Sequence, residues 1–147
     1  MDIVSSDKRS SMMAAVRQKH TKPEVTLRSA VHRLGLRFRL HRRDLPGSPD
    51  LVFPAALMVV FVHGCFWHRH EGCRKATTPA TRAKFWQEKF AKNIARDRTA
   101  KVALENAGWK VLVVWECELS SANAAATVAR SIATQVKKEL EFSAQTC

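Results

Sequence analysis

Three cysteines and a histidine strongly restrict how this chain can fold. Cys65, His70 and Cys73 belong to one short segment, and Cys117 follows far downstream. Thiolates and imidazoles in a set of four are the ligands of a closed, tetrahedral structural Zn²⁺ site. Cys117 directly follows the apolar run WKVLVVWE, so a shared ion would tie the first segment to the end of a buried strand. The sequence therefore predicts a loop that zinc holds against a sheet.

The same segment contains a second histidine, His68, shortly before His70. From the residues alone, either imidazole could bind the metal while the other stays free for chemistry. Phe66 and Trp67 also lie in this segment, and a structural zinc site does not need them. The combination indicates chemistry on a substrate that has a flat face and a charged backbone. The fourth cysteine, Cys147, is expected to be unrelated to the site.

The charge of the chain indicates a polyanionic partner. Lysine and arginine number 25 against 13 acidic residues, which gives a formal net charge of +12. Basic side chains that neutralise phosphates release condensed counterions, so nucleic acid is the natural partner. A ribosomal or generally adhesive basic protein is the alternative. No apolar run approaches the ~18–20 residues of a membrane span. Without a signal-peptide core we expect an unexported protein, whose cysteines bind metal rather than form disulfides.

The spacing of apolar and turn residues predicts a single domain over residues 1–147. Strands are predicted at 36–41, 51–53, 57–62 and 109–115. Helices are predicted at 6–18, from a capping box at Thr21–Glu24 to Gly35, at 80–106, and after a cap at Ser120 or Ser121. The last helix carries Val128, Ile132, Val136 and Leu140 at every fourth position. The predicted fold is therefore α/β, with the order α-β-β-β-α-β plus a C-terminal helix.

This order, with Asp50 at the head of the second strand, resembles the restriction-endonuclease-like core of the PD-(D/E)XK nucleases. Pro49 and Asp50 supply the first half of that motif. Phe61-Val62-His63 stands where an acidic-x-Lys triplet is usual, so the chain departs from the general superfamily pattern.

Five separated motifs make the resemblance more specific. TKPE, LPGSPDLVF, FVHGCFWHRHEGC, FWQEKFAKNIARDR and GWKVLVVWEC resemble, in this order, the very short patch repair (Vsr) endonucleases over residues 9–118. The resemblance implies an enzyme that nicks one strand of double-stranded DNA beside a T:G mismatch by Mg²⁺-dependent hydrolysis. It also implies a bacterial, cytoplasmic, nucleoid-associated protein with DNA-repair proteins as partners. We expect a monomer that does not bind membranes.

The resemblance assigns the residues of the catalytic metal site. Asp50 is expected to bind Mg²⁺ directly, together with the backbone carbonyl of Val62. Glu24 and His63 are expected to hold water molecules on the metal, where outer-shell groups orient the bound water. The residues alone also allow a turn cap at Asp50, a helix cap at Glu24 and a core role for His63.

His68 is expected to act as the general base or acid, because an imidazole titrates near neutral pH. The resemblance implies that Asp97 orients this imidazole. From spacing alone, Asp97 would instead form a surface ion pair with Arg96, Arg98 or Lys101.

The family pattern assigns the later histidine, His70, to zinc with Cys65, Cys73 and Cys117. Between His70 and Cys73 this chain has one residue more than the family pattern, so an exchange of roles between His68 and His70 stays open.

Phe66, Trp67 and Trp86 resemble the aromatic residues that Vsr enzymes insert into the base stack beside the mismatch. Unstacking a base step costs a few kcal/mol and costs less at a mismatched pair, so intercalation favours the lesion. Each ring could equally be ordinary core. Trp109 and Trp115 lie within the last predicted strand and are expected to be core.

The two ends of the chain carry the remaining expectations. Residues 1–20 form a basic segment expected to contact DNA, with Met13 as a second wedge and Arg9, Arg17 and Lys19 near phosphates. Residues 120–147 form the C-terminal helix and tail. Two other functions stay open: a non-catalytic zinc-containing DNA-binding module, and a metal-dependent nuclease for other damaged or branched DNA.

Overall fold

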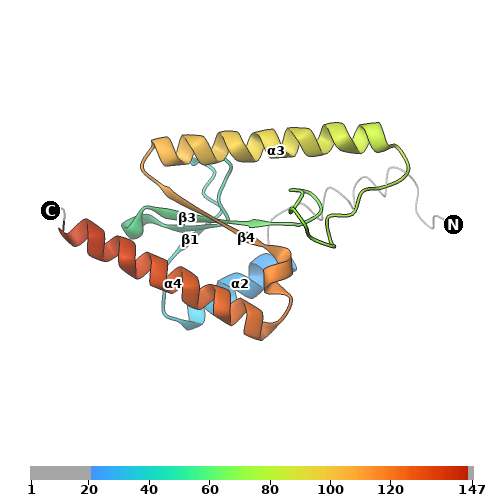
Figure 1. Ribbon diagram of the computed structural model, residues 1–147. Coiled ribbons are helices and arrows are strands. Elements are labelled where there is room, and N and C mark those ends of the chain that lie inside the picture. Colours follow the sequence, from blue (N-terminus) through green and yellow to red (C-terminus); the bar gives the residue numbers. More distant parts are fainter. Residues whose placement is uncertain (1–20, 146–147) are drawn as a thin grey trace.

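The computed structural model of the protein describes residues 21–145, which form a four-stranded sheet between two layers of helices. Helix α3 (Ala83–Asn106) covers one face of the sheet, and α2 (Lys22–Arg33) and α4 (Ala122–Gln145) cover the other (Figure 1). The strands are β1 (Arg39–Leu40), β2 (Leu51–Phe53), β3 (Met58–His63) and β4 (Lys110–Trp115). This element order agrees with the α-β-β-β-α-β order and C-terminal helix expected from the sequence. Short 3-10 helices occupy Pro54–Ala56 and Glu116–Leu119.

The pairing of β3 with β4 determines which segments meet at one edge of the sheet. The sheet order is β1-β2-β3-β4, with β1–β2 and β2–β3 antiparallel and β3–β4 parallel. In the parallel pair His63 lies opposite Trp115. The segment after His63 and the segment after Trp115 therefore leave the sheet side by side, which brings the cysteine-rich loop next to Cys117.

The main core lies between the sheet and the α2–α4 layer. Its buried members include Leu27, Val31, Leu51, Phe53, Met58, Val60, Ala129, Ile132 and Val136. A smaller apolar cluster of Val52, Val59 and Leu104 lies beneath α3. Of the predicted apolar stripe on α4, Leu140 is instead exposed, because the end of this helix extends beyond the sheet (Figure 1). Ser121 caps α4, since its Oγ accepts the backbone N–H of Ala124 at 3.1 Å.

Two local predictions were wrong. The predicted strand 36–41 shrinks to Arg39–Leu40, because Phe38 packs on Phe53 and the chain turns at His41, whose φ is +49°. The capping box at Thr21 does not form: the Thr21 side chain makes no cap hydrogen bond. Glu24 is buried there and contacts His41 instead. Within residues 21–145, no helix combines the length and apolar character needed to cross a membrane.

The predicted helix 6–18 and the residues Met13, Arg9, Arg17 and Lys19 lie outside the described part of the chain. They stay predictions.

Candidate active site

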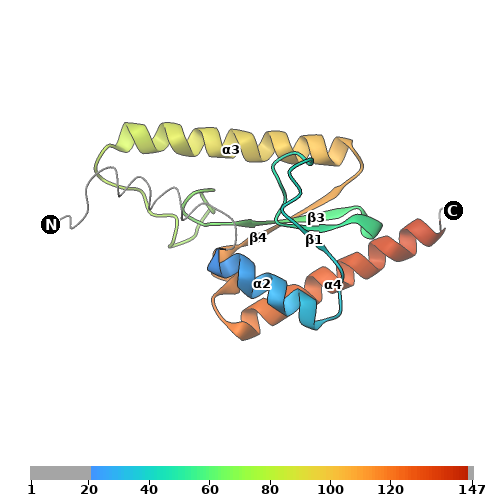
Figure 2. The ribbon, with the colours of Figure 1, turned by 180° about the vertical axis from the view of Figure 1, so that it is seen from behind.

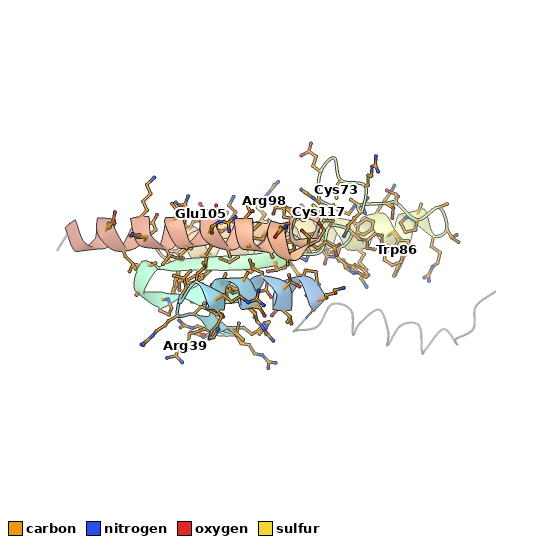
Figure 3. The ribbon with its side chains drawn as sticks, turned by 90° about the horizontal axis from the view of Figure 1, so that it is seen from below. Arg39, Cys73, Trp86, Arg98, Glu105 and Cys117 are labelled. Carbon is orange, nitrogen blue, oxygen red and sulfur yellow. The ribbon has the colours of Figure 1, made fainter. Side chains whose placement is uncertain are left out.

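Cys65, His70, Cys73 and Cys117 converge where β3 and β4 end, as the sequence predicts. One donor atom from each lies within 4.8 Å of the others. Nδ1 of His70 is 3.6 Å from Sγ of Cys65 and 3.4 Å from Sγ of Cys117. A tetrahedral Zn²⁺ ion, with its usual bond lengths to sulfur and nitrogen, separates such atoms by about 3.5 Å. Figure 3 shows Cys73 and Cys117 near each other at this end of the molecule.

The thiols of this cluster differ in their electrostatics. Burial raises the pKa of Cys65 to about 12, whereas the backbone N–H of Lys75 lowers the pKa of Cys73 to about 7. Three thiolates held this close repel one another, so a fully ionised cluster requires a cation. The donor set therefore fits a structural zinc ion.

Two side chains that sequence reasoning did not assign to this centre support it. Oε1 of Glu116 accepts the backbone N–H of Cys65 at 3.0 Å and so anchors the loop to the end of β4. Trp115, expected to be core, is only half-buried. Its ring stacks on His70, with centroids 4.2 Å apart and planes 9° apart, and its edge faces His63 at 5.3 Å. Trp115 therefore separates the thiolate centre from the neighbouring histidines.

His68 and Asp97 form a hydrogen-bonded pair, although they come from different elements. Nδ1 of His68, in the loop, lies 2.6 Å from Oδ2 of Asp97, midway along α3. A carboxylate at Nδ1 holds the proton on that nitrogen, which leaves Nε2 able to accept one. The ring of His63 stacks on His68 with centroids 3.9 Å apart. The pKa of His63 falls to about 4, first because the ring is buried and then because of the charge on His68.

Asp50 is held at the head of β2 by the backbone of β3. Its Oδ2 accepts the N–H of Val62 at 2.6 Å, and its own N–H donates to the carbonyl of Val60 at 3.1 Å. The pKa of Asp50 is raised to about 7, mainly by burial and to a smaller extent by the nearby carboxyl of Glu24. Two carboxyl groups held close together with little solvent favour a bound cation. The oxygen donors fit a hard divalent ion.

All but one of the predicted catalytic residues line one cavity of about 810 Å³ between the sheet and α3. Its lining includes Asp50, Val62, His63, His68 and Asp97, together with the basic side chains Arg43, Arg96, Arg98 and Lys101. Glu24 is not part of this lining. It is buried and contacts the lining residue His41.

Sequence reasoning missed His41. Its Nε2 lies against Oε1 of Glu24, and its Nδ1 lies 3.9 Å from Oδ1 of Asp50. Glu24, His41 and Asp50 form a second group of possible metal ligands within 4.8 Å. The run LRFRLH gives no signal for this, because the side chain is aimed by a backbone turn rather than by strand alternation.

Phe66, Trp67 and Trp86 form an aromatic cluster beside the loop. The ring centroid of Phe66 lies 5.0 Å from that of Trp67 and 5.6 Å from that of Trp86. All three are half-buried, and Phe66 and Trp86 pack on the buried Phe90, with ring centroids 5.2 and 5.9 Å away. A second residue that sequence reasoning missed, Arg69, places its guanidinium 4.0 Å from the Phe90 ring centroid and donates to the carbonyls of Phe66, Ala76 and Thr77. The cluster is therefore a braced, partly exposed aromatic surface.

Comparison with known proteins gives consistent matches. A family model described as "DNA mismatch endonuclease Vsr" matches residues 1–75. The type II nicking enzyme V.XorIIP of Xanthomonas oryzae pv. oryzae is 50% identical over 89% of this chain and 96% of its own length. The DNA mismatch endonuclease Vsr of Escherichia coli is 44% identical over 80% of this chain and 75% of its own. The type II nicking enzyme V.NmeAIP of Neisseria meningitidis is 43% identical over 82% of this chain and 85% of its own.

Proposed function

Since this chain belongs to the Vsr family of DNA mismatch endonucleases, we propose that it nicks one DNA strand beside a T:G mismatch, using Mg²⁺ bound at Asp50. That the chain is a mismatch-directed DNA endonuclease of very short patch repair follows from the family. The choice of T:G, the identity of the metals and the role of each residue are the proposal. The element order supports a PD-(D/E)XK core with Asp50 in its first carboxylate position.

One observation carries the assignment of the site. Asp50 from the sheet and the His68–Asp97 pair from the loop and α3 line the same cavity, and basic residues surround it. A metal-binding carboxylate, an oriented imidazole and positive charge are what hydrolysis of a phosphodiester requires. A DNA-binding module without catalytic activity would not need Asp50 and the His68–Asp97 pair in one cavity.

The geometry supports a role for each of the chain's own residues in this proposal. A divalent ion at this site would supply charge neutralisation at the phosphate and a more acidic water. Asp50 and the backbone carbonyl of Val62 would hold the ion, and the N–H of Val62 already fixes the Asp50 side chain. Glu24 and His63 would orient water molecules at the ion. His68 accepts a proton at Nε2, because Asp97 fixes the proton on Nδ1.

The zinc centre acts on the position of this base. Cys65, His70, Cys73 and Cys117 would fix the loop that carries His68, and His70 rather than His68 has its ring nitrogen among the thiols. The proposed roles of the two histidines therefore follow the family pattern. Loss of the ion would leave the imidazole without a rigid platform.

The aromatic cluster is proposed to enter the base stack at the mismatch. Phe66, Trp67 and Trp86 are partly exposed and braced from behind. Figure 3 shows Trp86 at the same end of the molecule as the cysteines. Lys89, whose Nζ lies 5.6 Å from the Trp67 ring, would place positive charge near phosphates on either side of the inserted rings.

A cleavage panel tests the proposal. The zinc-loaded protein is incubated with Mg²⁺ and duplexes that are matched or carry a T:G pair, a G:A pair or a nick. We expect one nick in one strand of the T:G duplex and little cleavage of the others. Equal cleavage of matched DNA would refute mismatch direction, and preference for the nicked duplex would favour a nuclease for damaged DNA.

Asp50→Ala tests the catalytic assignment in the same panel. The variant should lose cleavage and keep most of its DNA affinity, because the phosphate-binding surface is unchanged. Cleavage at the wild-type rate would remove Asp50 from the metal site.

A further inference from the structure

His41 connects the two carboxyl groups of the proposed metal site. Its Nε2 lies against Oε1 of Glu24 and its Nδ1 is 3.9 Å from Oδ1 of Asp50. The imidazole is 9% exposed and the Glu24 side chain 3%. The two carboxyl groups come from α2 and from the head of β2, which are far apart in the sequence. His41 offers one ring nitrogen to each of these carboxyl groups.

The backbone fixes the position of this imidazole. The N–H of His41 donates to the carbonyl of Asp50 at 3.3 Å, directly after the β1–β2 pairing ends. Its φ of +49° lies in the left-handed region, which costs a residue other than glycine about 1 kcal/mol or more. The surrounding structure holds the strained conformation, and the result is a side chain aimed between two carboxyl groups.

We propose that His41 is a positioning residue for the catalytic metal, holding Glu24 and Asp50 in the arrangement that binds the ion and its waters. The inference rests on the proposed assignment of Asp50 to the metal. Two carboxyl groups this close repel each other, and an imidazole between them can donate to one and face the other. Groups that orient metal ligands in this way typically change metal affinity 10- to 100-fold when they are removed.

Arg28 is the competing partner for Glu24. Its Nη1 lies 4.0 Å from Oε1 of Glu24, and its side chain is 24% exposed. An arginine at that distance can neutralise part of the charge on Glu24. If Arg28 alone positioned Glu24, replacing His41 would leave metal binding unchanged, so Arg28→Met belongs in the test.

Two amide substitutions separate the two ring nitrogens of His41. The amide nitrogen of glutamine can stand in place of Nε2 and reach Glu24, whereas that of asparagine stands in place of Nδ1 and does not reach it. His41→Gln should therefore restore most of the metal affinity that His41→Ala loses, and His41→Asn should not. His32→Ala, at an exposed histidine near the end of α2, is the control for removing an imidazole elsewhere.

Binding of Mn²⁺ to zinc-loaded protein, followed by the electron paramagnetic resonance of free Mn²⁺, measures affinity without catalysis. We expect His41→Ala to weaken binding 10- to 100-fold, and the Mg²⁺ concentration for half-maximal T:G cleavage to rise in parallel. The rate at saturating Mg²⁺ should fall much less. Unchanged Mn²⁺ affinity in His41→Ala, equal effects of the glutamine and asparagine variants, or a larger effect of Arg28→Met would overturn the inference.

Asp50→Ala in the same assays keeps this inference separate from the proposed function. If Asp50→Ala binds Mn²⁺ and cleaves as the wild type does, the assignment of the site itself fails. If Asp50→Ala loses both and His41→Ala loses neither, only the role of His41 fails. Should His41→Ala not fold, the glutamine and asparagine variants decide, because both keep an amide of similar size.

Discussion

The imidazole of His63 lies flat against that of His68, with ring centroids 3.9 Å apart and ring planes only 4° apart. Two protonated imidazoles cannot share this arrangement, because like charges so close disfavour the second protonation. Burial and the charge on His68 lower the pKa of His63 to about 4, so His63 is neutral near pH 7. His63 is therefore a poor proton acceptor in this stack near neutral pH.

Asp97→Asn tests whether His68 depends on its carboxylate partner. The amide no longer selects the proton on Nδ1, so we expect the single-turnover rate on a T:G duplex to fall about 10²- to 10⁴-fold. DNA affinity should change little. Asp44→Asn is the matched control, since Asp44 forms an exposed ion pair with Arg42, and such pairs contribute little. Similar rates in the two variants would mean that Asp97 is an ordinary surface acid.

Asp50→Asn should change the pH dependence of stability in the absence of Mg²⁺. The pKa of Asp50 is raised from 3.8 to about 7 by burial, on a side chain that is 20% exposed. Asp50 therefore contributes stability at pH below about 4, where its carboxyl is protonated in both the folded and the unfolded state. That contribution is lost as the pH rises through about 7, because the folded state then buries a charge.

We expect the free energy of unfolding of Asp50→Asn to rise relative to that of the wild type as the pH increases from 4 to 8. The gain should be on the order of 3 kcal/mol. Urea unfolding of both zinc-loaded proteins at several pH values measures this difference. The two proteins have the same histidines, so the contribution of histidine titration cancels in the difference. Added Mg²⁺ should stabilise the wild type and not the variant. If the difference in free energy of unfolding stayed constant with pH, the folded state would hold the ionised Asp50 carboxylate without losing stability.

The metal ligands made the central topology predictable. Cys65 and Cys117 could share an ion only if the strands before them ended at the same edge, and the parallel pairing of β3 with β4 meets that condition. β3 was predictable from its unbroken apolar run, because a strand buried on both faces does not alternate. The contact of His68 with Asp97 was expected from motif resemblance and not from any local pattern.

The residues that were missed depend on long-range packing or on unusual backbone. His41 reaches Glu24 through a left-handed turn, and a histidine gives no sequence signal for positive φ. Arg69 also has positive φ, +53°, and reads as one more basic residue in a basic chain. Trp115 follows the alternation of a core strand, yet its ring is placed between two imidazoles by a loop far away in sequence.

Cys117→Ser tests the structural metal. The variant should lose bound zinc, measured with a colorimetric chelator after denaturation. Its free energy of unfolding should fall by several kcal/mol, because structural zinc contributes directly to folding. T:G cleavage should fall with it, since the loop carries His68. Cys147→Ser is the control and should retain the metal content of the wild type. Full zinc content in Cys117→Ser would exclude that thiol as a ligand.

Gly47→Ala tests the contact between the turn before Asp50 and α3, which Figure 2 shows as a loop rising from the sheet to the helix. A Cβ at Gly47 would lie 2.7 Å from Cβ of Ala100 and 3.1 Å from Cζ of Phe61, and φ there is +75°. Gly35 has a similar φ of +77° with nothing within 4 Å. Gly35→Ala therefore measures the backbone strain alone, about 1 kcal/mol.

Gly47→Ala should cost that amount plus an overpacking penalty of about 1–3 kcal/mol, because the methyl of Ala100 is fixed to a helix and cannot rotate away. Asp50 follows this turn, and Asp97 lies on α3 one helical turn before Ala100. A methyl group that pushes the turn away from α3 therefore also moves Asp50 away from the His68–Asp97 pair. We therefore expect Gly47→Ala to lower the rate of T:G cleavage at temperatures where it is still folded, whereas Gly35→Ala should not. Equal stabilities of the two variants in urea unfolding would show that the turn and α3 are not in tight contact.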